Sequence, residues 1–251
     1  MDFEPVLRLG LLLVRAGMVF GTAPVFGGTA APTSLKIVLS VTMAMLMLPV
    51  VPIPGTVGPG ELTLVIAREA AIGLALAMAV RVMVAGAELA GQLAGFQLGL
   101  SFAAIVDPQT GVRSNVLAMM YGMLALFTFF GVNGHHAMIR ALARSYVELP
   151  VGPGGLDGSM TVLVSRMLGL IFLLGAQLAA PIVVVLIIVE LALGLIVRAA
   201  PAMNLMVIGF PLRLLVGLTA LAVAVQVVPL LVSRVAEPAF DLSLRTMLAF
   251  R

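Results

Sequence analysis

The chain has 251 residues, of which 62% are hydrophobic and 10% are charged, and its mean hydropathy is +1.21. A soluble domain is closer to half apolar and a quarter charged, so this composition excludes an ordinary water-soluble domain and predicts an integral membrane protein. The net charge of +3 comes from scattered residues and indicates no nucleic-acid partner, and the absence of cysteine excludes disulfides and cysteine-based metal sites.

Apolar stretches separated by Pro and Gly predict an all-α, polytopic membrane protein built of kinked helical hairpins. The first segment, residues 6–26, carries Arg8 and Arg15, which share a helix face because they are seven residues apart. These arginines either extend to the membrane surface or contact a neighbouring subunit. We expect the first helix to be retained, because Asp2 and Glu4 replace the basic residues that begin a signal peptide.

A second apolar helix is expected from Pro32 and Lys36 to Pro49, and a third apolar segment begins at Glu61 and continues to about Val106. This third segment is longer than the roughly 20 residues needed to cross the hydrocarbon. It is either two helices or one long helical hairpin, with Gly86 as the expected bend. Glu88 and Gln92 form a polar stripe that either lines a water-filled path or bonds to a partner. Small residues four positions apart let helix backbones approach closely. The glycines expected to form such a packing face are Gly91, Gly95 and Gly99.

A polar break separates this segment from the next apolar run. Asp107 and Pro108 favour a turn, and Gly111 continues the break. Non-helical backbone is tolerated at membrane depth only where it is buried in protein or lines a water-filled cavity. We therefore expect either a loop inside a pore or an ordinary turn at the membrane surface. The break comprises Asp107, Pro108, Gln109, Thr110, Gly111, Val112, Arg113, Ser114 and Asn115.

The only two histidines, His135 and His136, follow an Asn-Gly pair at a helix entry. No metal site is expected, because adjacent histidines point to different helix faces and no further ligand follows one turn later. The motifs of nucleotide hydrolases, zinc proteases and serine hydrolases are absent, so neither a cofactor nor an enzymatic activity is expected. Residues 148–160 form the strongest internal boundary, but apolar sequence on both sides favours a single domain over residues 1–251.

An apolar helix expected in the last third carries one acid, Glu190, and ends at Arg198, with Gly194 one turn from each. Charges in such sequence usually face protein or water and are functional. Along one straight helix the two would be about 12 Å apart, so each is expected to reach a partner on another helix or subunit. A corner at residues 201–204 follows, and a second apolar helix is expected to begin around Pro211.

This stretch resembles the FliR family, the export-gate subunit of bacterial flagellar type III secretion. The family usually has Gln where this chain has Ala202. The export-gate T subunit of injectisomes shares much of the pattern and is the nearest alternative, although the Asn-Gly-His motif at Asn133 resembles the flagellar branch. The resemblance rests on Pro181, Glu190, Gly194, Arg198, Pro201, Asn204 and Gly209, and on an amino-terminal set of Arg15, Gly17, Pro24, Phe26, Gly27, Pro32 and Lys36.

The resemblance implies a pore-forming subunit in the bacterial inner membrane, at the flagellar basal body. It implies assembly with FliP- and FliQ-type subunits, contact with FlhB- and FlhA-type export components, and passage of unfolded flagellar proteins. Residues 107–115 occupy the position of the family's plug loop. A secondary transporter is the alternative from the residues alone, because transporters contain broken helices and the chain offers breaks at Asp107-Pro108 and Pro181.

Overall fold

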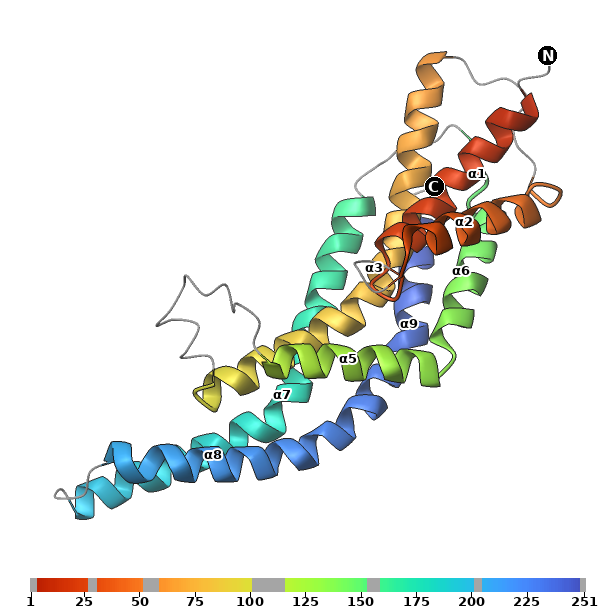
Figure 1. Cartoon of the computed structure of the whole chain (residues 1–251). Helices are drawn as coiled ribbons and strands as arrows, with labels where there is room; N and C mark the ends of the chain where they lie inside the picture. The colour runs from red at the N-terminus through yellow and green to blue at the C-terminus, as the bar shows by residue number, and fades with distance from the viewer. Residues whose placement is uncertain are drawn as a thin grey trace, which may run out of the picture. The chain divides into compact units, whose positions relative to one another are not determined.

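The computed structural model describes residues 4–26, 31–51, 59–100, 116–152, 159–200 and 205–248. Within these ranges the regular structure is helical and contains no strand, which confirms the all-α class. The elements, shown in Figure 1, are α1 (Glu4–Thr22), α2 (Thr33–Met47), α3 (Pro59–Gln97), α5 (Val116–Gly131), α6 (Gly134–Glu148), α7 (Ser159–Ala199), α8 (Leu205–Ala224), the 3-10 turn η1 (Val225–Val227) and α9 (Val228–Leu248).

Several of these helices have the length and composition of membrane spans, as the hydropathy predicted. Among the described residues, four stretches qualify, and α5 and α6 qualify together as one bent pair. Backbone groups in hydrocarbon must be satisfied within the protein, which is why such apolar sequence folds into helices. The four stretches are Pro5–Thr22, Gly60–Gln97, Thr161–Ala199 and Val207–Arg245.

The expected division of this segment into two helices or a hairpin is wrong, because α3 is one continuous helix of 39 residues, and the bend expected at Gly86 stays a prediction. A Cβ atom at Gly86 would lie 2.9 Å from Leu174 Cδ2, so this glycine allows α3 and α7 to pack closely. The helix ends beyond Gln97 in a turn in which Gly99 has φ +75°. The Leu100 amide donates to the Gly95 carbonyl and the Gly99 amide donates to the Phe96 carbonyl. This is the Schellman arrangement, in which a left-handed glycine terminates a helix.

Prolines lie inside the long helices near the carboxyl terminus and do not divide them. The helix α7 has 41 residues and continues through Pro181, which corresponds to about 61 Å at 1.5 Å per residue. The expected helix start at Pro211 is also wrong, because α8 begins at Leu205 and contains this proline. The helix α9 likewise continues through Pro238.

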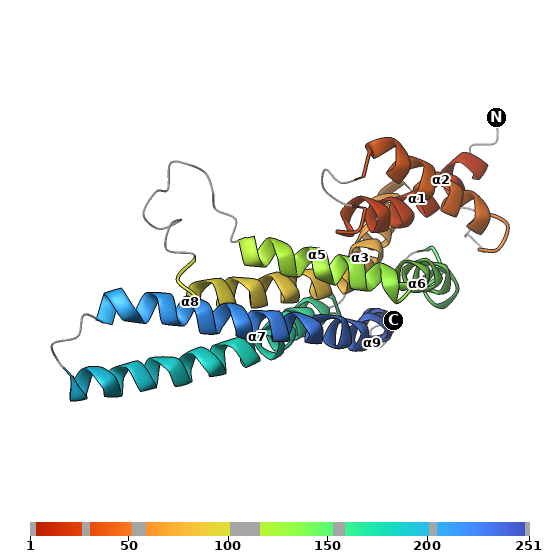
Figure 2. The ribbon, with the colours of Figure 1, turned by 60° about the horizontal axis from the view of Figure 1, so that its bottom comes forward.

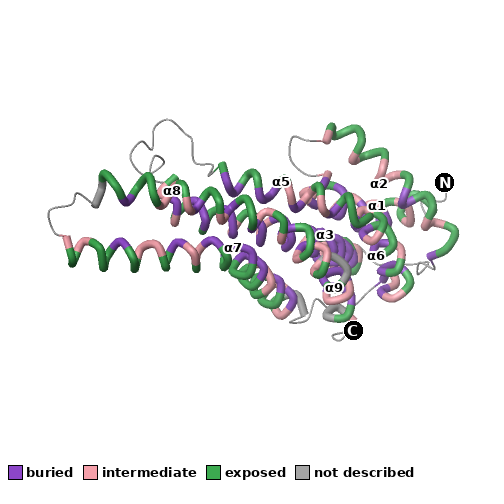
Figure 3. The backbone as a smooth tube through the Cα atoms, turned by 90° about the horizontal axis from the view of Figure 1, so that it is seen from below, coloured by how far each residue is buried: buried purple, intermediate pink, exposed green. Residues whose placement is uncertain are grey.

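The chain divides into two compact units, each made of segments that are distant in sequence. The first unit comprises Met1–Val82, Phe129–Gly169 and Val235–Arg251, and in it α1 packs against α2. The second unit comprises Met83–Thr128 and Leu170–Arg234. In the second unit α7 and α8 run side by side (Figure 2), and exposed residues recur along both helices (Figure 3).

Candidate functional site

The most extensively bonded charged group of the first unit is Arg15 of α1, whose side chain is fully buried beside the equally buried Glu69 of α3. The Arg15 Nε atom donates to Glu69 Oε2 at 2.7 Å, and Nη2 donates to Oε1 at 2.9 Å. This bidentate geometry matches the planar guanidinium to the carboxylate, the strongest common form of a charge-assisted hydrogen bond. The pair joins α1 to α3 across 54 residues of sequence.

The remaining Arg15 donors meet the carboxyl-terminal end of α6. Nη1 donates to the Ser145 carbonyl at 2.7 Å and to Ser145 Oγ at 3.1 Å, and Nη2 donates to the Leu149 carbonyl at 2.9 Å. All five guanidinium N–H groups therefore have acceptors. The last carbonyls of a helix lack intrahelical donors and carry partial negative charge, so a cation is stabilising at this position. Arg15 thus joins three helices.

Neighbouring side chains complete the burial of this group. The Tyr146 ring lies 4.5 Å from the Arg15 guanidinium carbon, and the Tyr146 hydroxyl donates to the Leu12 carbonyl at 2.7 Å. A Cβ atom at Gly73 would lie 2.5 Å from the Arg15 carbonyl oxygen, so α1 and α3 meet where no side chain fits. Both expectations for Arg15, extension to the membrane surface and contact with another subunit, are wrong: the residue is internal to the chain.

A second arginine of the same unit bonds to the segment after α6. Arg68 Nη1 donates to the Gly152 carbonyl at 2.9 Å and to the Pro150 carbonyl at 3.4 Å. Arg68 and Glu69 are adjacent in α3: Arg68 bonds to the segment after α6 directly, and Glu69 pairs with Arg15, which bonds to the end of α6. The signal in the sequence was a pair of charges inside an apolar helix, since such charges are costly unless they have partners.

In the second unit, Glu190 of α7 forms an ion pair with Arg213 of α8, at 2.8 Å between Oε1 and Nη2. Glu190 therefore reaches a partner on another helix, and this partner, Arg213, is not indicated by sequence spacing. Arg198 lies exposed in the last turn of α7, and a Cβ atom at Gly194 would meet nothing within 4 Å. Pro201 and Asn204 lie outside the described residues.

The three glycines expected to form one packing face have different environments. A Cβ atom at Gly91 would lie 2.6 Å from the Ala118 Cα and would also overlap the Leu117 carbonyl, so α3 and α5 approach backbone to backbone at this point. Gly95 is buried within α3. Gly99 lies beyond the end of the helix and terminates it. The close approach is thus placed at Gly91.

The remaining residues singled out from the sequence are the break at 107–115 and the histidine pair, and neither forms a site within the described residues. The whole break at Asp107–Asn115 lies outside them. The His135 and His136 rings are 4.2 Å apart at the start of α6, where Asn133 has φ 57°. Among the described residues, no group of three or more His, Cys, Asp or Glu side chains is placed to hold a metal ion.

Taken together, long apolar helices and charges that join one helix to another define a polytopic helical membrane protein. Comparison with known proteins identifies the family to which the chain belongs. The family model described as bacterial export proteins, family 1, matches residues 6–238. The chain belongs to this family, the FliR family of flagellar export components.

Three relatives, each named flagellar biosynthetic protein FliR, illustrate the extent of the match. The protein of Pectobacterium carotovorum subsp. carotovorum is 34% identical over 231 residues, which cover 91% of this chain and 88% of the relative. The protein of Escherichia coli (strain K12) is 35% identical over 211 residues, covering 84% and 81%. The protein of Bacillus subtilis (strain 168) is 30% identical over 241 residues, covering 94% and 92%.

Proposed function

We propose that the chain is a pore-forming core subunit of the flagellar type III protein export gate. It resides in the bacterial inner membrane at the flagellar basal body, and unfolded flagellar proteins pass through the pore. Its partners are FliP- and FliQ-type subunits in the pore, with FlhB- and FlhA-type components in contact. The observation that carries the proposal is the match to a bacterial export family over residues 6–238, supported by FliR relatives aligned along most of both chains.

The hairpin of α7 and α8 supports assembly with other subunits. An apolar surface of this extent must be covered by lipid or by protein, and in a gate complex both are present. Its large exposed side chains lie on both helices. They include Val184, Ile187, Ile188, Leu191, Leu195, Val207, Phe210 and Leu215.

Within this function, residues 107–115 serve as a plug that closes the pore. The support is in the sequence: the segment is polar, is interrupted by Pro108 and Gly111, and connects two apolar helices, α3 and α5. Deleting Thr110–Asn115 should let small ions leak across the membrane while the complex still assembles. Conductance of cells expressing the deletion, with assembly checked in parallel, tests this. Intact complexes without added leak contradict the plug.

The function itself is tested by purification of the full chain in mild detergent, followed by mass spectrometry of the proteins that accompany it. We expect the export-gate subunits to co-purify, and we expect cells without the chain to secrete no flagellar proteins and to be non-motile. An untagged chain provides the control for purification. A chain that purifies alone, from cells whose flagellar export is unaffected by its loss, contradicts the proposal.

A further inference from the structure

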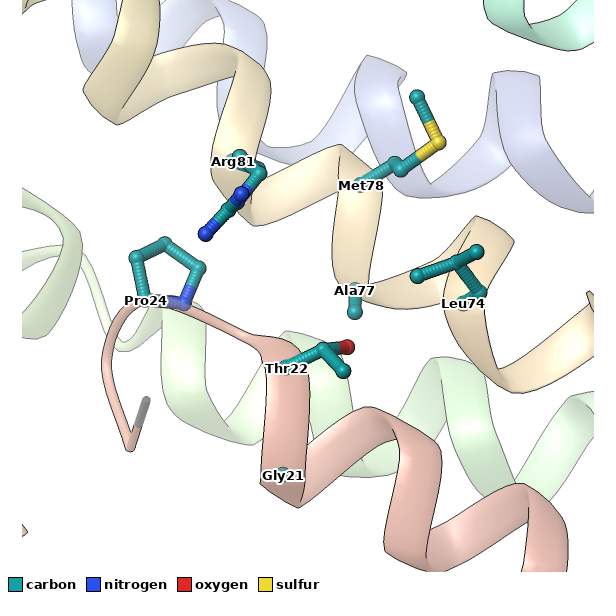
Figure 4. A pocket seen from close by; sticks show the side chains of 7 residues that line it. All are labelled: Gly21, Thr22, Pro24, Leu74, Ala77, Met78 and Arg81. Carbon is teal, nitrogen blue, oxygen red and sulfur yellow. The ribbon is translucent and has the colours of Figure 1, made fainter. Parts of the chain in front are cut away.

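The first unit contains a cavity of about 510 Å³ between the end of α1 and one face of α3. The α3 residues that line it recur at helical spacing and so occupy one face of the helix. Its volume lies within the ~300–1,000 Å³ of ordinary small-molecule sites. The lining residues, labelled in Figure 4, are Gly21, Thr22, Pro24, Leu74, Ala77, Met78 and Arg81.

Arg81 supplies the positive charge of this cavity. Its side chain is exposed and its guanidinium points toward Pro24 at the end of α1 (Figure 4). Across the part of the chain that the structure describes, no carboxylate forms an ion pair with Arg81, in contrast to Arg15, Arg144 and Arg213. A cation in an apolar helix of a membrane protein is costly without a counter-charge. The cavity therefore favours an anionic ligand.

The level of Arg81 relative to a bilayer follows from contacts inside the first unit. Arg15 meets Glu69, Met18 meets Gly73, and Thr22 lines the cavity with Met78, so α1 and this part of α3 run in the same direction at matched heights. The apolar stretch of α1 is Pro5–Thr22, about 27 Å long. This length is close to the ~30 Å of the hydrocarbon.

The matching stretch of α3 has the same length. Residues 62–80 lie between the exposed side chains of Glu61 and Arg81 and rise about 28 Å. The two charges within this stretch have partners: Glu69 is paired with Arg15 and Arg68 bonds to backbone carbonyls. Arg81 is the first exposed charge after this stretch, and the apolar sequence of α3 continues beyond it to Gln97. A bilayer that covers residues 62–80 would bring lipid phosphates to the level of Arg81.

The part of the lining that α3 contributes is apolar at Leu74, Ala77 and Met78 and cationic at Arg81. Leu74 precedes Arg81 by seven residues, or about 10 Å along the helix. We propose that this cavity binds an anionic phospholipid, whose phosphate pairs with Arg81 and whose acyl chains lie against Leu74, Ala77 and Met78. A net negative headgroup is favoured over a zwitterionic one, because each basic residue near an anionic surface adds attraction. This inference does not depend on the proposed export function.

The chain contains no tryptophan, so one introduced tryptophan reports on the cavity alone. The test uses Met78→Trp and Leu74→Trp in full-length protein reconstituted into bilayer nanodiscs, with lipids brominated on the acyl chain as quenchers. We expect brominated phosphatidylglycerol to quench at about fivefold lower mole fraction than brominated phosphatidylcholine. Inorganic phosphate should not relieve the quenching, which separates a lipid from a free anion.

Two matched variants identify the residue responsible. Arg81→Gln in either reporter background should abolish the preference for phosphatidylglycerol. Arg144→Gln removes an exposed arginine of the same unit that already pairs with Glu148 and Asp241, and it should leave the preference unchanged. Circular dichroism confirms that each variant is folded.

Three results overturn the proposal. One is equal quenching by the two lipids, and another is a preference that survives Arg81→Gln. The third is loss of co-purifying subunits in Arg81→Gln without any change in lipid preference, which assigns the cavity to a carboxylate of a neighbouring chain instead. None of these depends on whether the pore exports protein.

Discussion

The buried Arg15–Glu69 pair provides a quantitative test of how the first unit is held together. Arg15→Met removes the cation but keeps an unbranched side chain of similar length, and Glu69→Met removes the anion in the same way. Each single change leaves the other charge fully buried without its partner, because both side chains have no exposed surface. Breaking a buried pair from one side costs about 3–5 kcal/mol.

The double variant should be less damaging than the sum of the two single variants. With both charges gone, no ion is left buried, and the main loss is the donor to the Leu149 carbonyl. The Ser145 carbonyl still accepts the Leu149 amide at 2.9 Å, and the Ser145 hydroxyl still donates to the Leu142 carbonyl at 2.7 Å. One unpaired carbonyl costs about 1–3 kcal/mol. The coupling energy between the two substitutions should therefore be at least about 3 kcal/mol.

The free energy of unfolding can be measured by titrating the purified chain with SDS in mixed micelles and following helical circular dichroism. Arg144→Met serves as the control, because Arg144 is 57% exposed in its pairs with Glu148 and Asp241. Exposed pairs contribute at most ~1 kcal/mol. Single variants within 1 kcal/mol of the parent protein, or a double variant equal to the sum of the singles, would refute the reasoning.

Two further predictions concern the second unit. Gly91→Leu should displace α5 from α3, because the Ala118 backbone leaves no room, and should cost at least about 1–3 kcal/mol. Native electrophoresis should show less assembled complex, whereas Gly60→Leu, in the first turn of the same helix where a Cβ atom meets nothing within 4 Å, should assemble normally. Glu190→Gln should weaken the hairpin contact with Arg213, and exchanging the two charges should restore protease resistance of the hairpin. Equal resistance in all three proteins contradicts the second prediction.

The helical class was predictable because hydrocarbon forces apolar backbone into helices, and hydropathy reports this directly. Breaks were less predictable. A glycine inside a helix costs only about 1 kcal/mol relative to alanine. Gly86 was therefore a weak indication of a helix end, because breaking backbone hydrogen bonds in hydrocarbon costs more than that. Pro211 lies inside α8 because membrane helices tolerate proline where neighbouring groups bond to the backbone carbonyl that proline leaves without a donor.

The charged contacts could be predicted only in part. The separation of Glu190 and Arg198 indicated that Glu190 needs a partner outside its own helix. Its identity depended on how α8 aligns with α7, which local sequence does not encode. The sequence suggested that Arg15 extends to the surface or contacts another subunit, and it gave no sign of the internal partners Glu69 and the end of α6, which are distant in sequence. Equal spacing likewise did not distinguish Gly91 from Gly99, because α3 ends between them.

The completeness of the Arg15 hydrogen bonds also bears on the order in which the chain is built during synthesis. The Glu69 carboxylate emerges first and can fill two of the five donors, while the Ser145 acceptors emerge about 76 residues later. At ~5–20 residues per second, this delay is about 4–15 s. During that interval the guanidinium can hold water or lipid oxygens in place of α6. Once α6 has been synthesised, its carbonyls replace those temporary acceptors. The Arg15–Glu69 pair is then a preformed binding site for a later segment of the same chain.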